Sequence, residues 1–430
     1  MKSFLTSVIT ILFLSGTYLQ AQPVEQRVKV VVAPDHTDWI YKKGEKATFS
    51  ISVLNNGNLL ENALVKYEIG PEKMQAIKKG ELLLKNGKTS LDGGTMTEPG
   101  FLRCVVTIEN EGRIYRGLAT AGYEPQTIQP AAATPANFRQ FWDSAKAELA
   151  TVPLDAKMIL LPERCNSKVN VYELNLQNYG NSRLYGILCV PKAPGKYPAL
   201  LTVPGAGVRS YYGDTGTAST GVITLDIGIH GIPVTLPEKV YDDLRKGAFR
   251  FYNEYNLDNK DRYYYKRVYL GCVRANDFLT SMPEFNGNLG VTGGSQGGAL
   301  AIITGGLDKR VKAVVSFFPA LSDMAGFLKN RANGWPDFFD KNKITYNNTP
   351  QKLETISYYD VVNFAKLLTV PIKMSWGFND EICPPTSVYA AYNSIQSPKS
   401  AELYPDTGHW AYPEQGNKLW QWMMGQIKSQ

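Results

Sequence analysis

Short apolar and polar runs alternate between residues 25 and 122, and turn residues separate them. Alternation with a period of two buries one face of a strand and exposes the other. The turns include Asn55-Asn56-Gly57-Asn58 and Asn86-Gly87, which suit tight connections between antiparallel strands. The pattern predicts an immunoglobulin-like β-sandwich over residues 22–123. Six runs carry it: 28–32, 47–54, 63–69, 81–84, 101–108 and 113–119.

The pattern changes at a Pro- and Ala-containing stretch, residues 124–134, which predicts a linker. A helix is expected over residues 137–150, because apolar side chains recur there on one face. Strand and helix patterns then alternate to the C-terminus. This alternation predicts a doubly wound, mostly parallel sheet covered by helices on both faces, over residues 135–430.

The N-terminal segment has the pattern of an export signal. A positive charge at Lys2 precedes an apolar run from Phe4 to Leu14, and small residues stand near Ala21. The apolar run is too short to span a bilayer as a helix, so residues 1–21 are expected to be a signal peptide. No cysteine precedes Cys104 that could carry an N-terminal lipid. We expect a periplasmic or secreted protein without a stable membrane anchor.

Charge and cysteine content exclude some classes of protein. The net charge of +7 comes from 46 basic and 39 acidic residues with no basic block, which argues against a nucleic-acid partner. The cysteines have neither the paired spacing of a zinc site nor the density of a disulfide scaffold, so buried free thiols are expected. There are five: Cys104, Cys165, Cys189, Cys272 and Cys383.

The segment Gly293-Gly294-Ser295-Gln296-Gly297-Gly298 contains a Gly-x-Ser-x-Gly motif. An apolar strand precedes it and a helix-forming run follows, which is the context in which such a serine is a nucleophile. Gly293 and Gly297 leave the room that a sharp strand-to-helix turn needs. An ordinary tight connection would need similar glycines. A phosphate-binding loop is disfavoured, because no Lys-Ser or Lys-Thr follows the glycines. Ser295 is therefore the predicted nucleophile.

A serine nucleophile needs a base. The chain has three histidines, His36, His230 and His409. The order Ser, Asp, His that α/β-hydrolases use leaves only His409 downstream of Ser295, in a Gly-His loop after a short apolar strand. His409 is the predicted base.

The acid that orients the base has more candidates. Asp380 follows the strand at residues 370–376 and a glycine turn, which places its carboxylate at the edge of the sheet expected for Ser295. Asp323 and Asp360 stand near helix starts, where a carboxylate commonly caps amide groups. Asp380 is the predicted acid, and Glu381 is the nearest alternative.

Two backbone amides are expected to form an oxyanion hole. The N–H of Gln296 lies at the first turn of the helix after the nucleophile. A second N–H normally comes from a loop after an earlier strand, and residues 198–207 form such a strand and loop. Ala206 is its predicted donor.

Further motifs run through the C-terminal part of the chain. They are Phe138-x-x-Phe141-Trp142, Val152-Pro153-Leu154, the Tyr-rich run 261–269, the serine turn, Tyr359 to Ala365, and Cys383-Pro384-Pro385-Thr386 after Asp380. With them, residues 135–428 resemble the acetyl xylan esterase and cephalosporin-C deacetylase family, which is carbohydrate esterase family seven of the α/β-hydrolases. The resemblance implies a Ser295, Asp380 and His409 triad with the Ala206 and Gln296 amides as oxyanion donors. It implies no metal or organic cofactor, and it leaves a homo-oligomer open.

The chain departs from the family pattern at three places. His230-Gly231-Ile232 stands where the family has Arg-Gly-Gln, Trp410 replaces a glutamate after the base, and Gly271-Cys272 replaces Asp-Ala. These positions surround the triad, so they bear on substrate range more than on the reaction. His230, Trp410 and Tyr211 are candidates for the substrate pocket. For His230, a structural role in a Gly-rich loop is favoured over a role in the pocket.

The leading hypothesis is a serine esterase that removes acetyl or other short acyl groups from hydroxyls of acetylated oligosaccharides or polysaccharides, such as xylan. A prolyl-oligopeptidase-like peptidase is a second hypothesis. It is disfavoured because the β module is too short for a propeller. A glycan-binding protein on an inactive hydrolase fold is a third. The β module itself either binds glycan or serves as a spacer or packing partner, because fold alone does not give function.

Overall fold

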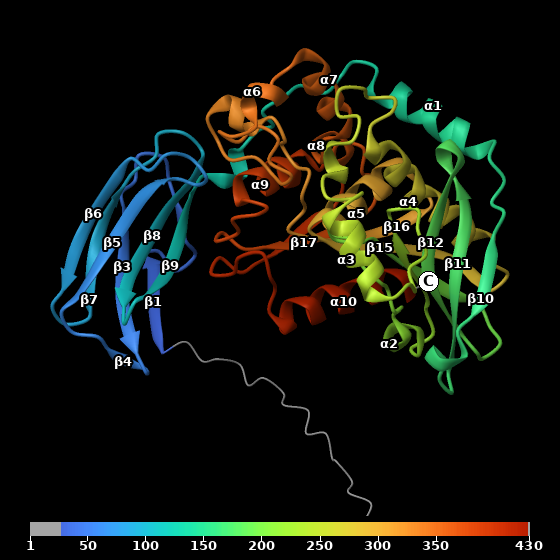
Figure 1. Ribbon diagram of the computed structural model, residues 1–430, viewed down its shortest axis with the longest axis horizontal. Coiled ribbons are helices and arrows are strands. Elements are labelled where there is room, and N and C mark those ends of the chain that lie inside the picture. The colour runs from blue at the N-terminus through green and yellow to red at the C-terminus, as the bar shows by residue number, and fades with distance from the viewer. Residues whose placement is uncertain (1–26, 429–430) are drawn as a thin grey trace, which may run out of the picture.

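The computed structural model describes residues 27–428, so the predicted signal peptide lies outside the described residues. A β-sandwich and a larger α/β unit lie side by side (Figure 1). Within the described range, no helix combines the length and apolar character needed to cross a membrane. The five cysteines are all free thiols, and four of them are buried.

Two sheets form the sandwich, and their strands alternate buried and exposed positions as the sequence predicts. Valines and leucines from both sheets fill its core. All six predicted strands form, but Lys88–Gly94 was missed because Leu91 is its single large apolar side chain. One sheet holds β1 (Val28–Pro34), β3 (Ala47–Asn55), β4 (Asn58–Leu59) and β7 (Lys88–Gly94); the other holds β2 (Ile40–Tyr41), β9 (Arg113–Tyr123), β8 (Gly100–Asn110), β5 (Ala63–Pro71) and β6 (Lys78–Leu84).

The connection between the units is held against the α/β unit along its length. It contains a 3-10 turn, η1 (Pro125–Thr127). Asn393 Nδ2 donates hydrogen bonds to the carbonyl oxygens of Pro125 and Ile128, at 3.0 and 2.9 Å. The N–H of Ala131 donates to Asp323 Oδ1 at 2.6 Å. Asp323 thus binds the connection, and the expectation that it caps a helix was wrong.

A nine-stranded sheet organises the α/β unit. Parallel pairs join the six strands β14, β13, β15, β16, β17 and β18, in that spatial order. Antiparallel pairs join β10, β11, β12 and β14 at one edge. The sheet is thus mostly parallel, as expected. Its spatial order is β10 (Lys157–Leu160), β11 (Val169–Asn178), β12 (Ser182–Pro191), β14 (Ile223–Gly228), β13 (Tyr197–Thr202), β15 (Phe285–Gly294), β16 (Val311–Phe317), β17 (Ile372–Trp376) and β18 (Lys399–Leu403).

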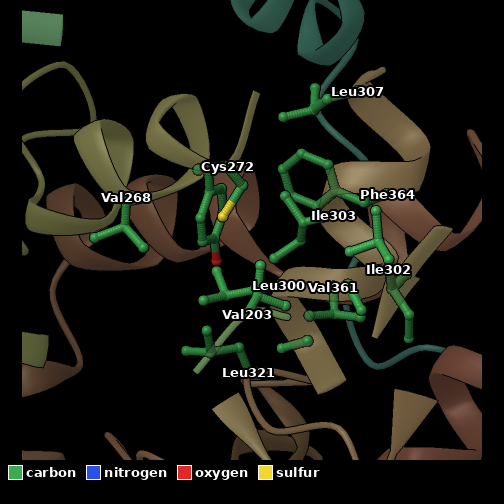
Figure 2. Close-up of a cluster of buried hydrophobic side chains, with 14 of the residues drawn as sticks. Val203, Val268, Cys272, Leu300, Ile302, Ile303, Leu307, Leu321, Val361 and Phe364 are labelled. Atoms are coloured by element: carbon green, nitrogen blue, oxygen red, sulfur yellow. The ribbon is translucent and has the colours of Figure 1, made fainter. Parts of the chain in front are cut away.

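Helices cover both faces of the sheet. On one face, α5 carries apolar side chains that pack with α4 and α8; Figure 2 shows Leu300 and Ile303 gathered with Cys272 and Phe364. On the other face, α10 packs on β13 and β16. The α-helices are α1 (Phe138–Ala150), α2 (Thr215–Ala218), α3 (Glu238–Lys246), α4 (Tyr264–Ser281), α5 (Gln296–Leu307), α6 (Ile344–Asn347), α7 (Pro350–Tyr359), α8 (Val361–Ala365), α9 (Pro385–Ser394) and α10 (Pro413–Lys428). The remaining 3-10 turns are η2 (Pro162–Arg164), η3 (Tyr179–Asn181), η4 (Tyr252–Glu254) and η5 (Gly326–Lys329).

Asp360 caps a helix, as the sequence predicts. Asp360 precedes α8 and accepts a hydrogen bond from the N–H of Val362 at 3.0 Å. It also accepts from the N–H groups of Asp323 and Met324, at 2.9 and 2.7 Å. This carboxylate therefore caps α8, as expected, and holds the turn that follows β16.

Replacement of Gly297 by Ala should destabilise the fold. A Cβ there would lie 2.3 Å from the carbonyl oxygen of Val203, so the backbone must shift. Overpacking of this kind costs about 1–3 kcal/mol of unfolding free energy. Gly425→Ala is the control, because that exposed position in α10 has open space around it and Ala favours helix by up to about 1 kcal/mol. We expect a lower urea midpoint for Gly297→Ala and an unchanged or higher one for Gly425→Ala; equal midpoints would contradict this.

Candidate active site

Ser295 stands at a sharp turn between β15 and α5. Its backbone has φ 59° and ψ −123°, in the positive-φ region that residues other than glycine rarely adopt. A Cβ on Gly293 would lie 2.5 Å from the backbone of Gly297, and one on Gly297 would meet Val203. The two glycines therefore permit the close approach of the β13 loop to the serine turn, and they leave the room that the sharp turn was predicted to need. Strain of this kind is concentrated at functional sites.

A continuous chain of hydrogen bonds links Ser295, His409 and Asp380. His409 Nε2 lies 2.9 Å from Ser295 Oγ, and His409 Nδ1 lies 2.8 Å from Asp380 Oδ2. Because a carboxylate only accepts, Nδ1 carries the proton and Nε2 is left to accept from the serine hydroxyl. The structure thus brings together all three residues that the sequence singled out, although Ser295 and His409 are 114 positions apart.

Asp380 is fully buried, and both of its oxygens have partners. Oδ2 faces His409, and Oδ1 accepts hydrogen bonds from the N–H groups of Ile382 and Cys383 at 2.8 and 2.9 Å. Glu381, the alternative acid, points elsewhere: its carboxylate makes a bidentate pair with Arg116 at 2.7 and 2.8 Å. Of the two neighbouring carboxylates, only Asp380 reaches the histidine.

The Gln296 side chain connects the two segments that were predicted to bear the oxyanion donors. Its Nε2 donates to the carbonyl oxygen of Pro204 at 3.1 Å, two residues before Ala206. Its Oε1 accepts hydrogen bonds from the hydroxyls of Tyr252 and Tyr265, each at 2.7 Å. Burial raises the pKa of Tyr252 to about 12, which keeps this hydroxyl a donor.

These two tyrosines are site residues that reasoning from single positions missed. Tyr265 belongs to the Tyr-rich run 261–269, which only the family resemblance singled out. Tyr252 lies in an unpatterned loop between α3 and α4 and carried no sequence signal. Both are buried, and the amide that they hold is fully buried as well.

A cavity of about 370 Å³ opens beside the predicted oxyanion loop. Ala206 and Gly207 line one side of it, and Phe249, Tyr252 and Trp335 line others. The predicted oxyanion loop thus faces open space that can hold a small acyl group. Within residues 27–428, no cluster of three or more His, Cys, Asp or Glu side chains could hold a metal ion.

His230 is buried and does not line this cavity, so it is the structural histidine that the sequence favoured and not a pocket residue. Its ring packs against Phe249 and Tyr252, with centroids 4.7 and 4.8 Å away. Nε2 lies 2.9 Å from the carbonyl oxygen of Gly207, and Nδ1 lies 2.7 Å from the hydroxyl of Tyr264. Burial lowers the pKa of His230 to about 4, so the ring is neutral at pH 7, with the proton on Nε2. This histidine supports the oxyanion loop from behind.

Tyr211 and Trp410, the other pocket candidates, differ in their surroundings. Tyr211 packs in a separate apolar cluster with Val234 and β12, and its hydroxyl is buried without a partner, so it does not line the cavity. The pocket assignment of Tyr211 was therefore wrong. Trp410 directly follows the base and is 48% exposed, with its ring 4.8 Å from that of Tyr412. It stays a candidate for substrate contact.

His230 predicts a pH-dependent stability. A histidine whose folded-state pKa is lowered from about 6.5 to about 4 stabilises the fold fully above pH 6.5, and that contribution is lost as the pH falls toward 4. Wild type should therefore lose up to about 3 kcal/mol relative to His230→Gln between pH 7 and pH 4, as measured by urea unfolding. Tyr264→Phe removes a hydrogen bond but keeps the titrating ring, so it should retain the wild-type pH dependence. A constant difference between wild type and His230→Gln would contradict this account.

The chain matches known proteins over both of its units. The model of the acetyl xylan esterase family matches residues 123–426. The acetyl esterase Axe7A of Xylanibacter ruminicola is 38% identical over 436 residues, covering 100% of this chain and 98% of that protein. The second match extends through the sandwich, whereas the family model begins where the sandwich ends.

Solved structures of similar proteins correspond to the α/β unit. The acetyl xylan esterase from Paenibacillus sp. R4 aligns with a TM-score of 0.61 and 28% identity, over 71% of this chain and 99% of its own. Acetyl xylan esterase 1 from Thermoanaerobacterium sp. JW/SL YS485 aligns with a TM-score of 0.59 and 25% identity, over 70% of this chain and 97% of its own. The chain therefore belongs to the acetyl xylan esterase family and is a carboxylic ester hydrolase of the α/β-hydrolase fold that deacetylates carbohydrates.

Proposed function

We propose that Ser295 is the nucleophile, His409 the base and Asp380 the orienting acid in the removal of acetyl groups from xylan or xylo-oligosaccharides. The observation that carries this assignment is the unbroken hydrogen-bond chain from Ser295 Oγ through the imidazole to a buried carboxylate. A serine hydroxyl becomes a good nucleophile when a base accepts its proton and a third group orients that base.

In the acylation step, Ser295 Oγ attacks the ester carbonyl carbon and its proton moves to His409 Nε2. The negative charge on the carbonyl oxygen is stabilised by the N–H groups of Ala206 and Gln296, whose segments the Gln296 side chain holds together. The tetrahedral species then breaks its bond to the sugar oxygen, which takes the proton from Nε2. An acetylated Ser295 and a free sugar hydroxyl result.

In the deacylation step, water replaces the sugar. His409 takes a proton from the water as its oxygen attacks the acetyl carbonyl, and the same two amides stabilise the second oxyanion. Collapse returns the proton to Ser295 Oγ and releases acetate. Asp380 holds the imidazole in place throughout and stabilises its charged form, because its second oxygen is fixed by two backbone amides.

The surroundings of the triad support a small acyl group on a large alcohol. The cavity beside Ala206 is small, and selection among acyl chains by such a space is steric. Outside it, the exposed ring of Trp410 next to the base offers an apolar face of the kind that stacks on sugars. Xylan is proposed as the carbohydrate because the family model and the solved relatives bear that name.

Export of the protein is part of the same proposal. The N-terminal segment has the pattern of a signal peptide, and a polymeric polysaccharide is met outside the cytoplasm. A peptidase or a purely glycan-binding role is not favoured, since the family and the curated relative are esterases.

Replacement of each triad residue should abolish or nearly abolish acetate release from acetylated xylo-oligosaccharides. Ser295→Ala removes the bond-forming oxygen, and Asp380→Asn should lower kcat by roughly 10⁴-fold because the imidazole loses its tautomer and orientation. A fluorophosphonate probe should label wild type at Ser295 and leave Ser295→Ala unlabelled. Unchanged acetate release by folded Ser295→Ala would rule out the assignment.

Trp410→Ala should separate sugar recognition from chemistry. Loss of a stacking ring worth about 1–1.5 kcal/mol should lower kcat/KM for an acetylated xylo-oligosaccharide about tenfold and leave 4-nitrophenyl acetate hydrolysis within twofold. Trp420→Ala is the matched control, because Trp420 is 40% exposed but lies on α10 and bonds to Thr217. Equal losses on both substrates, or none on either, would show that Trp410 is not a sugar platform.

A further inference from the structure

The sandwich contacts the loop that carries Asp380 at every residue from 378 to 381. The ring of Phe378 packs edge-on against Phe101 of β8, with centroids 5.1 Å apart. Arg103 of β8 donates hydrogen bonds to the carbonyl oxygens of Phe378 and Asp380, both at 3.1 Å. Glu381 pairs with Arg116 of β9. We call residues 378–381 the acid loop; it lies on the sandwich.

Asn379 joins the acid loop both to the sandwich and to the histidine loop. Its Oδ1 accepts from the hydroxyl of Thr120, and its Nδ2 donates to the carbonyl oxygens of Leu118 and Asp406. Its backbone N–H donates to Thr407, two residues before His409. The acid and the base therefore share a support that includes β9 of the sandwich.

Arg103 is the buried centre of this contact, with a side chain only 6% exposed. Nε donates to Thr120 Oγ1 at 2.9 Å, and Nη2 donates to Glu72 at 3.2 Å as well as to the two acid-loop carbonyls. Glu72 in turn accepts from the N–H of Thr386, at the start of α9. The guanidinium thus links β8, β9 and the residue that follows β5 to the segment that follows β17.

A buried ion pair of this kind is not explained by stability alone. Burial raises the pKa of Glu72 to about 7, because desolvation outweighs the attraction of Arg103. Desolvation of two charges usually cancels most of their attraction, and apolar side chains of similar volume often stabilise as well or better. The specific result of placing an arginine here is the directional pair of bonds to the carbonyls of Phe378 and Asp380.

The family model covers the α/β unit without the sandwich, since it matches residues 123–426. The Paenibacillus sp. R4 esterase aligns over 99% of its own chain but only 71% of this one. In the present chain, the acid-loop carbonyls that Arg103 binds would lose their partner if the sandwich were removed. The acid loop here is built to be completed by the other domain.

We propose that Arg103 is a positioning residue of the esterase, through which the sandwich holds the acid loop so that Asp380 meets His409. The proposal rests on the proposed role of Asp380 in the triad. It assigns to the sandwich a part in the reaction that requires no contact with substrate. Displacement of a catalytic group by about 1 Å commonly costs about 10²-fold in rate.

The test compares Arg103→Met, Arg103→Lys and Arg116→Met in the full chain, with 4-nitrophenyl acetate as substrate. Arg103→Met should lower kcat by about 10- to 100-fold and leave KM within twofold, and Arg103→Lys should recover part of the loss. Arg116→Met is the matched control, because its exposed pair with Glu381 reaches the same loop but contributes little. It should stay within twofold of wild type.

A double variant separates positioning from general damage. Arg103→Met added to Asp380→Asn should cause no further loss of kcat, because the residue through which Arg103 acts is already disabled. Equal fractional losses in both backgrounds, or wild-type kcat in folded Arg103→Met, would overturn the proposal. If Arg103→Met does not fold, Thr120→Val takes its place with the same expected pattern on a smaller scale. Full activity of Asp380→Asn would instead overturn the triad assignment.

Discussion

The bond between His409 Nδ1 and the buried carboxylate of Asp380 is the interaction on which the rest of the site depends. A carboxylate without exposure is tolerated only when its lone pairs are used, and here two backbone amides occupy one oxygen and the imidazole the other. That arrangement fixes the tautomer of the histidine, and the tautomer fixes which nitrogen can accept the proton of Ser295. The position of the acid loop therefore sets the chemistry of a serine far away in the sequence.

The serine turn and the acid loop are held by different means. At the serine turn, Gly293 and Gly297 allow backbone to touch backbone, and the Gln296 amide locks α5 to the β13 loop under two tyrosine hydroxyls. At the acid loop, a second domain supplies an arginine, a threonine and an aromatic ring. Packing within the α/β unit defines the first site, whereas packing against the sandwich defines the second.

This difference explains how much of the site could be predicted from sequence. Ser295 and His409 could be identified because a motif and a scarcity of histidines are local facts. Asp380 was chosen because it follows a strand and a glycine turn, with Glu381 as the nearest alternative, and the structure separates the two because Glu381 pairs with Arg116. The roles of Tyr252 and Arg103 could not be predicted, because each depends on segments brought together by the fold. The sandwich strands were predicted from their alternation, except for β7, whose single large apolar side chain is Leu91, and the two-residue strands β2 and β4.

The triad geometry implies that this esterase works through an acetyl group carried by Ser295. The most direct measurement is rapid acid quench of the full chain during turnover of an acetylated xylo-oligosaccharide, followed by peptide mass spectrometry. One added acetyl group is expected on the peptide that contains Ser295, formed before steady-state acetate release and absent in Ser295→Ala. Acetate release with the acetyl group on another residue, or with no acyl-enzyme at any quench time, would contradict it.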